Sequence, residues 1–496
     1  MADLTLEPLT PYWWLRRLHA RVAARRPHVQ KLWRYYDGEH PLAFASTKFL
    51  NTFGGLFNAY ADNWCPLIVE AVGQRLHVEG FRFGDDPAAD DDAWGLWQSN
   101  NMDAKSELAI YEALITGESY ATAWYGDTPD EIELTIEPAA NAIVELDPKN
   151  PQRRLAGLRC YVAEDGYERA ELFLPDTVYL YRSSTPVGDT MMVIPSDQWW
   201  AVDEATFPDG EVPNPTGVVP MVPLTNRPRL MRHRWLDTTA QSEIATVLAQ
   251  QDALNVLAAD LLVAAERHAL PQRWVTGLEI KRDPVTNQPL PPFKADDTIW
   301  QAEDGSTDGV TFGQFQAADL GNYVKAIEQA VQHLASQTQT PPHYFYLGGG
   351  QPPSGESIRS AEAGLVAKAR SKMKHFGEAF EEVMRIAFAL TDDPRSKATR
   401  AETIWADPET RTYSELSDAL LKQQALNVPD QALWEKAGYS PTEIARFRTM
   451  RAEQALLTPP PIPPGVQPAA LRPAIGVPKE QVPAVPVPGL EARPPQ

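Results

Sequence analysis

Three carboxylates close together in the sequence are the first candidates for chemistry. Asp127, Glu131 and Glu133 lie in one short stretch, and carboxylate oxygens are the ligands that Mg²⁺ prefers in proteins. In a nuclease, such a group would hold the metal ion that activates the attacking water. Because the stretch has the pattern of a turn between two strands, a solvated acidic turn is the simpler interpretation. A metal-dependent DNA-processing enzyme is kept as an alternative function.

The patterns that mark other kinds of active site are absent. The chain contains no G-x-x-x-x-G-K-[ST] loop, no H-E-x-x-H and no G-x-S-x-G, so a nucleotide motor of the usual kind is not expected. The glycine triplet 348–350 lacks the spaced third glycine of a dinucleotide-binding loop, and more simply supplies backbone freedom. Glu381 and Glu382 fall on a predicted helix, where we expect solvated charge. We predict no catalytic residue, no cofactor and no bound metal.

The chain has two cysteines, Cys65 and Cys160. They form no C-x-x-C pair and have no histidine cluster nearby in the sequence, so the spacing does not indicate a zinc site. We expect two small residues that are buried or half-buried among apolar neighbours.

The charge balance limits how the chain can bind nucleic acid. The formal net charge is -21, whereas a protein that grips nucleic acid usually carries a basic face. If DNA is a partner, the contact is loose or confined to a small surface, and an acidic wall would let DNA slide. A solvated acidic surface without any partner is the alternative. No apolar run reaches the ~18 to 20 residues of a membrane span, so we expect a soluble chain and no membrane partner.

The first third of the chain is predicted to be mainly helical. Thr10 before Pro11 suits a helix start, and we expect this helix to end near residue 26, where Pro27 interrupts it. A second helix at 28–36 would end before Gly38. Further helices are predicted at 63–76 and 105–116, separated by an acidic loop at 85–92.

A strand-rich region follows the helices. Short β-type runs alternate with turn residues between 119 and 226. We predict a mostly antiparallel unit with strands at 120–125, 132–137, 155–162, 169–174 and 178–181.

Long helices dominate the rest of the chain. We predict a helix at 241–268 with Thr238 and Gln241 in capping-box spacing, a mixed segment, a helix at 320–336 and a loop at 337–353. A stripe of apolar residues then predicts a helix at 357–390, about 50 Å long at ~1.5 Å per residue. This exceeds the usual length in a globular domain and suggests a strut in a large assembly. A strand at 401–405 and helices at 413–426, 430–437 and 441–457 complete an α+β fold, and the proline-rich segment 458–496 is expected to be a disordered tail.

An ordered series of motifs resembles the portal proteins of long-tailed phages, especially those of actinobacterial hosts. The motifs are YYDGEHPL (35–42), RLHVEGFRF (75–83), WQSNNMD (97–103), EALITGESYATAWYG (112–126), GVVPMVPLTNRP (217–228), TQTPPHYF (338–345) and SGESIRSAEAGLVAKA (354–369). No single motif is specific alone. The series extends from about residue 10 to 457.

The resemblance implies a portal fold with wing, stem, clip and crown regions. It divides the chain into the wing (1–237), a stem helix (238–268), the clip (269–318), a second stem helix (319–336), the tunnel loop (337–353), the long wing helix with a strand (354–411), the crown helices (412–457) and the tail (458–496). A homododecameric ring at one capsid vertex is implied, assembled in the host cytoplasm, with double-stranded DNA passing through it without sequence specificity. The implied partners are the terminase large subunit, the major capsid or scaffold protein and the head-tail connector. A different head structural or connector protein is a further alternative.

The resemblance also assigns candidate site residues. The tunnel loop contributes Gln339, Thr340, Pro341, His343, Tyr344, Phe345, Tyr346, Gly348, Gly349 and Gly350. The start of the long helix contributes Ser354, Glu356, Ser357 and Arg359, and the clip contributes Arg273, Lys281 and Arg282 as contacts for terminase or connector. For the aromatic residues of the loop two outcomes stay open, since they either contact DNA and neighbouring subunits or are buried in the wing core.

Overall fold

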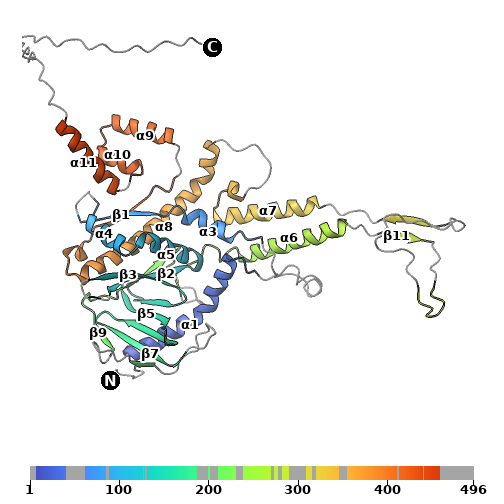
Figure 1. Ribbon diagram of the computed structural model, residues 1–496, viewed down its shortest axis with the longest axis horizontal. Helices are drawn as coiled ribbons and strands as arrows, with labels where there is room; N and C mark the ends of the chain where they lie inside the picture. The colour runs from blue at the N-terminus through green and yellow to red at the C-terminus, as the bar shows by residue number, and fades with distance from the viewer. Residues whose placement is uncertain are drawn as a thin grey trace, which may run out of the picture. The chain divides into compact units, whose positions relative to one another are not determined.

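The computed structural model describes residues 7–40, 62–84, 89–126, 128, 131–186, 199–201, 210–230, 238–269, 273–277, 282–289, 309–314, 320–345, 355–409, 413–439 and 441–457. It contains the α+β mixture that the sequence predicts (Figure 1). The chain divides into two compact units, Met1–Pro441 and Thr442–Gln496. Apart from its first residue, helix α11 (Pro441–Leu457) belongs to the second unit.

The N-terminal segment forms one helix rather than two. Helix α1 (Pro11–Tyr36) begins as predicted, with the Thr10 hydroxyl accepting a hydrogen bond from the Trp13 amide, but it continues through Pro27. The predicted break is wrong because apolar side chains on both sides of the proline are buried, Val22 at 0% exposure and Val29 at 2%. Packing of one continuous apolar face outweighs the loss of one backbone hydrogen bond.

The strands of the strand-rich region pair in antiparallel sheets, as predicted. One sheet has the order β4 (Ala142–Leu146), β5 (Arg154–Val162), β6 (Tyr167–Phe173), β7 (Thr177–Pro186) and β8 (Trp199–Ala201), and β9 (Glu211–Pro213) also pairs with β7. A second sheet has the order β10 (Met221–Thr225), β2 (Glu118–Tyr125) and β3 (Ile132–Pro138). Helix α1 packs on β4, β5 and β6 through a core that includes Leu15, Leu18 and Leu158.

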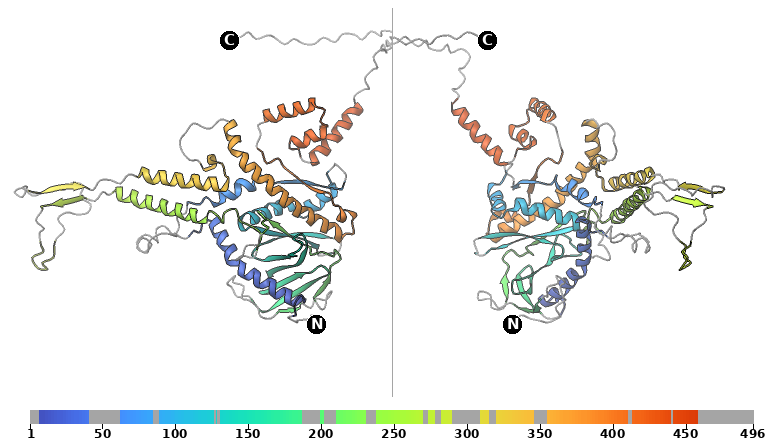
Figure 2. Two further views of the ribbon diagram at one scale, coloured as in Figure 1. Left: turned by 180° about the vertical axis from the view of Figure 1, so that it is seen from behind. Right: turned by 45° about the vertical axis from the view of Figure 1, so that its right-hand side comes forward.

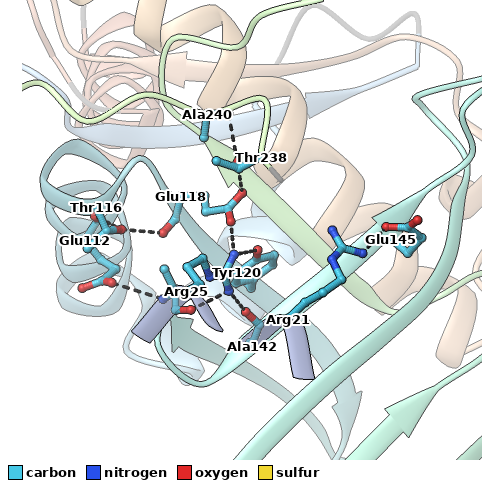
Figure 3. Close-up of polar contacts among 11 residues, drawn as sticks. Arg21, Arg25, Glu112, Thr116, Glu118, Tyr120, Ala142, Glu145, Thr238 and Ala240 are labelled. Carbon is cyan, nitrogen blue, oxygen red and sulfur yellow. Dashed lines mark hydrogen bonds and ion pairs between the residues drawn. The ribbon is translucent and has the colours of Figure 1, made fainter. Parts of the chain in front are cut away.

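A buried arginine joins α1 to both sheets (Figure 3). The Arg25 guanidinium pairs with Glu118 and donates to the Tyr120 hydroxyl at 3.0 Å and to the Ala139 and Ala142 carbonyls. On the other side, the Thr238 hydroxyl donates to Glu118 Oε2 at 3.1 Å. A buried charge is tolerated only when it is paired and hydrogen-bonded in this way. The cluster therefore fixes the helix, the strands and the segment at Thr238 to one another.

The largest core lies between the second sheet and several helices. It includes residues of α3 (Cys65–Gly73), α5 (Met102–Thr116) and the longest helix, α8 (Gly355–Leu390). Helix α5 ends at Gly117, as predicted, with φ at +107°. Strand β1 (Val78–Phe83) pairs with β13 (Ala401–Trp405) beside α8. Both cysteines are buried, which confirms the prediction of buried positions.

The acidic segment after β1 is not entirely a loop. Asp90 caps α4 (Asp91–Ser99) by accepting from the Ala93 amide at 2.9 Å, and Asp91 and Asp92 lie in the first helical turn. Carboxylates stabilise this end of a helix. The loop prediction is wrong there, and residues 85–88 lie outside the described part of the chain.

Helices α6 (Leu248–Ala269) and α7 (Gly321–Thr338) lie side by side (Figures 1 and 2). The predicted start of α6 at residue 241 is wrong, because Ser242 caps a short turn instead, accepting from the amides of Ile244 and Ala245. Between α6 and α7 in the sequence, β11 (Arg273–Thr276) and β12 (Thr311–Gln314) form an antiparallel pair.

Strand β13 and the helices α9 (Tyr413–Ala425) and α10 (Asp430–Lys436) follow the long helix close to their predicted positions. The 3-10 helix η2 (Pro394–Lys397), which was not predicted, precedes β13. Among the helices that the structure describes, none combines the length and the apolar character that a membrane span requires.

Candidate functional site

The region where α7 meets the start of α8 contains most of the described candidate residues. Backbone and side-chain hydrogen bonds define the end of α7. Gln339 adopts a left-handed conformation with φ at +56°, and the Thr340 amide donates to the Ala335 carbonyl at 3.1 Å. Thr338 and Thr340 are buried and their hydroxyls hydrogen-bond to each other at 3.0 Å. The chain therefore leaves α7 in a defined direction.

The next residues form η1 (Pro342–Phe345), a short 3-10 helix. Prolines at 341 and 342 suit this turn because their φ angle is preset. Phe345 is 2% exposed and lies against Trp64, with ring centroids 5.3 Å apart. Of the two outcomes left open for the aromatic residues, burial is the one observed for Phe345.

Polar contacts hold η1 against α8. Arg75 donates to the Tyr344 hydroxyl at 2.8 Å, and this hydroxyl donates to Glu362 Oε1 at 3.0 Å. Arg75 also pairs with Glu362 at 3.3 Å, and His343 Nε2 lies 3.6 Å from the same carboxylate oxygen. Burial raises the pKa of the Tyr344 hydroxyl, so it remains a donor at neutral pH. We call Arg75, His343, Tyr344, Phe345 and Glu362 the loop anchor.

A second polar cluster joins α8 to the segment before α6. Glu243 is 2% exposed and pairs with Lys372 and, at 2.6 Å, with Lys368. Burial alone would raise the pKa of the Glu243 carboxyl, but the two ammonium groups lower it to about 2. Lys372 also donates to Asn226 Oδ1 at 2.5 Å. The carboxylate thus stays ionised at neutral pH and keeps two lysines of α8 in place.

A cleft of about 730 Å³ opens beside this cluster. Its lining carries more positive than negative charge, although the chain as a whole is acidic. The charged and titratable side chains of the lining are Arg227, Arg229, Lys368, Lys372, His375 and Glu243. We call this cleft the basic pocket.

The other candidate residues are spread over three places. Glu356 and Ser357 are exposed in the first turns of α8, and Arg359 is half-buried next to them. Arg282 is exposed and donates to the Asn287 carbonyl at 3.1 Å, while Arg273 lies on β11. Tyr346, Gly348, Gly349, Gly350, Ser354 and Lys281 lie outside the described residues.

The prediction that Glu381 and Glu382 are solvated is wrong. Glu381 and Glu382 do not form a solvated pair: Glu381 is 8% exposed and accepts from the Thr403 amide, and Glu382 pairs with Arg154 at 2.7 Å. Glu131 and Glu133 are exposed, and Asp127 lies outside the described residues. Neither glutamate belongs to the group of potential metal ligands found in the described part of the chain.

Known proteins resemble the chain over most of its length. A family model described as phage portal protein, SPP1 Gp6-like, matches residues 15–455. The portal proteins of Mycobacterium phages D29 and L5 are each 31% identical over 411 residues, which is 79% of this chain and 79% and 78% of theirs.

Solved structures of gene transfer agent particles are also similar. A chain from the neck of an empty particle has a TM-score of 0.44 at 12% identity, and covers 80% of this chain and 88% of its own. A chain from the neck of a native particle has a TM-score of 0.42 at 11% identity, and covers 81% and 96%. On the family match and the two mycobacteriophage relatives, the chain belongs to the SPP1 Gp6-like family of phage portal proteins.

Proposed function

We propose that the chain is a structural subunit of a ring at one vertex of a phage capsid, through which the genome is packaged and later ejected. The observation that carries this proposal is the family match, which extends over residues 15–455. That range includes helices α6 and α7, the loop anchor and nearly all of α11. The ring is a homododecamer, assembled in the host cytoplasm, and it does no catalysis of its own.

The surface of α8 supports assembly. The helix has 36 residues and is about 54 Å long at ~1.5 Å per residue. Its second half is buried in the core of its own chain, but most residues in its first ten positions are exposed. In a closed ring, every subunit presents one surface to the next and a different surface to the previous one. The first turns of α8 supply one such surface.

The α6–α7 pair supports the same conclusion. Leu262 is 42% exposed on α6 and Val324 is 45% exposed on α7. On the β11–β12 pair, Trp274 and Phe312 are 36% and 41% exposed. Apolar side chains that one chain leaves in water are covered when neighbouring subunits pack together. We assign α6 and α7 to the stem and the β11–β12 pair to the clip, which would dock the terminase large subunit and the head-tail connector.

The remaining regions follow from this assignment. Residues 1–237 and 354–411 form the wing, which faces the major capsid or scaffold protein, and 412–457 form the crown. The tunnel loop extends from residue 337 to 353. In its described part, His343, Tyr344 and Phe345 contact other parts of the same chain. We therefore assign DNA contact to Tyr346 and the glycine triplet 348–350. The first turns of α8, at Glu356, Ser357 and Arg359, border the channel on one side, and the neighbouring subunit covers their other side.

Contact with DNA is weak and independent of sequence in this proposal. A net charge of -21 opposes tight binding to phosphates, which suits a duplex that must slide. The basic pocket is a local exception, and Gln337, Thr338 and Gln339 at the end of α7 form part of its lining. It fits the expectation that any attraction is confined to a small surface.

Location and activity separate this proposal from its alternatives. Gold-labelled antibody against an exposed tag on the chain should mark one vertex of the virion that contains it. Labelling along the tail or on every vertex would instead indicate another head or connector protein. A DNA-processing enzyme would cleave DNA with Mg²⁺ or Mn²⁺ and lose that activity on Asp127→Asn and Glu131→Gln substitution. We expect no cleavage attributable to these residues.

A further inference from the structure

Three potential metal ligands from different elements meet inside the wing. His19 lies on α1, Cys160 on β5 and Glu168 on β6, and their side chains are 5%, 1% and 1% exposed. Their ligand atoms, the imidazole nitrogen, the sulfur and a carboxylate oxygen, all lie within 4.8 Å of one another. Among the residues that the structure describes, this is the group of three potential ligands that lie close enough together to hold one metal ion. It is far from the loop anchor in sequence and takes no part in the proposed channel.

The distances within the group do not match a well-formed ion pair. His19 Nε2 lies 3.4 Å from Glu168 Oε2, whereas charge-assisted hydrogen bonds are typically about 2.7 to 2.9 Å long. The other oxygen, Oε1, is buried without a hydrogen-bond partner, and the Arg26 guanidinium lies 3.6 Å from it. A buried carboxylate with such long contacts is poorly compensated for its loss of water.

The same distances match the spacing of ligands around zinc. With Zn–N and Zn–O distances near 2.0 to 2.1 Å and tetrahedral angles, two such ligands are about 3.3 Å apart, and a sulfur and a nitrogen are about 3.6 Å apart. The His19–Glu168 separation is already within about 0.1 Å of that value. The sulfur of Cys160 lies at most 4.8 Å from each of the other two ligand atoms, so each of these distances would have to shorten by up to about 1.2 Å to complete the set.

We propose that His19, Cys160 and Glu168 form a zinc site that joins α1 to β5 and β6. Three protein ligands leave one position for a water molecule. Arg26 lies next to the bound carboxylate, where it orients Glu168, as partners behind metal ligands commonly do. Softer thiolate and imidazole ligands favour zinc over magnesium or calcium at this position.

Two measurements on the assembled, full-length protein test this site. After chelator treatment and dialysis, the protein is titrated with Co²⁺ as a spectroscopic substitute for zinc. We expect one Co²⁺ per subunit, with the intense near-ultraviolet band of a thiolate-to-cobalt bond and the visible bands of tetrahedral coordination. Added Zn²⁺ should then abolish the spectrum by displacing cobalt.

The variants Cys160→Ser and His19→Gln should lose stoichiometric binding, with affinity falling at least tenfold. Cys65→Ser is the matched control, because Cys65 is also buried but lies outside the group. It should keep both the metal and the spectrum. Absence of a thiolate band in the wild-type protein would overturn the proposal even if every variant misfolds, and so would binding that is unchanged in Cys160→Ser. In either case the group is a buried ion pair only.

Discussion

Lys368 Nζ lies 2.6 Å from Glu243 Oε2, so one buried carboxylate links the long helix to the segment that leads into α6. Lys372, one turn further along α8, pairs with the other oxygen of the same carboxylate. In the proposed ring, this contact connects the helix beside the channel with the stem. Replacement of this carboxylate by an amide, as in Glu243→Gln, therefore tests how much the contact stabilises the fold.

Glu243→Gln should destabilise the subunit by about 3 to 5 kcal/mol, because it leaves two lysines near a neutral group in a buried setting. Urea unfolding followed by circular dichroism, with the oligomeric state held constant, measures the change. Asp418→Asn is the control: Asp418 pairs with Lys422 on an exposed face of α9, and such a pair contributes at most about 1 kcal/mol. Equal effects of the two substitutions would contradict the role assigned to Glu243.

The same carboxylate predicts a dependence of stability on pH. The pKa of Glu243 is about 2 in the folded chain, against an ordinary value of 4.5. A depressed carboxyl pKa contributes stability that is present above pH 4.5 and is lost as the pH falls toward 2. The difference in unfolding free energy between wild type and Glu243→Gln should therefore shrink from pH 6 to pH 3. A difference that stays constant over this range would show that Glu243 does not supply it.

The loop anchor should depend on the burial of Phe345. Phe345→Ala removes a ring that is 2% exposed, and should cost about 3 to 5 kcal/mol of unfolding free energy. Leu108→Ala is the control, since this side chain is 67% exposed on α5, and we expect a change of about 0.5 kcal/mol or less. Thermal or urea unfolding distinguishes them. A cost for Phe345→Ala as small as that of the control would mean that η1 is not held by this contact.

Deletion of residues 348–350 tests the tunnel-loop assignment separately from stability. The anchor residues before the triplet keep their contacts, so rings should still assemble. We expect packaging or retention of DNA to fall, because the loop loses the glycines that give its backbone freedom. Complementation of a phage that lacks its own copy of the gene, with packaged DNA counted per particle, gives the readout. Packaging at the wild-type level would show that the assignment is wrong.

Much of the fold could be predicted from local patterns in the sequence. The apolar stripe on α8 predicted a helix that begins within two residues of the observed start and ends at Leu390. Gly117 predicted the end of α5, and turn residues separated most of the strands. These features depend on neighbours in the sequence, where helix period, strand alternation and glycine conformation are all visible.

The errors arose where distant residues decide the local structure. Pro27 stays inside a helix because Val22 and Val29, on either side of it, are both buried. Glu381 is buried because the Thr403 amide, on a later strand, donates to it. Neither partner can be identified from spacing in the sequence, since tertiary packing overrides local preference.

The candidate sites show the same limit. His19 and Cys160 lie far apart in the sequence, so the lack of a histidine near Cys160 in the sequence did not reveal that the two side chains lie close together in the fold. Glu362 and Glu243 were missed for the same reason, because their partners lie on other elements. The helix after the predicted loop was located correctly, as α8, whereas the assignment of residues 337–353 to the tunnel loop stays a prediction.

In the proposed function, many copies of this chain surround an axial channel. Electron microscopy of the purified protein, at high concentration in a buffer that permits assembly, would detect such an assembly. We predict rings with a central hole and twelve-fold symmetry, in which neighbouring subunits cover the first turns of α8. A population that remains monomeric under these conditions, with no annular particles, would show that the chain does not form this ring.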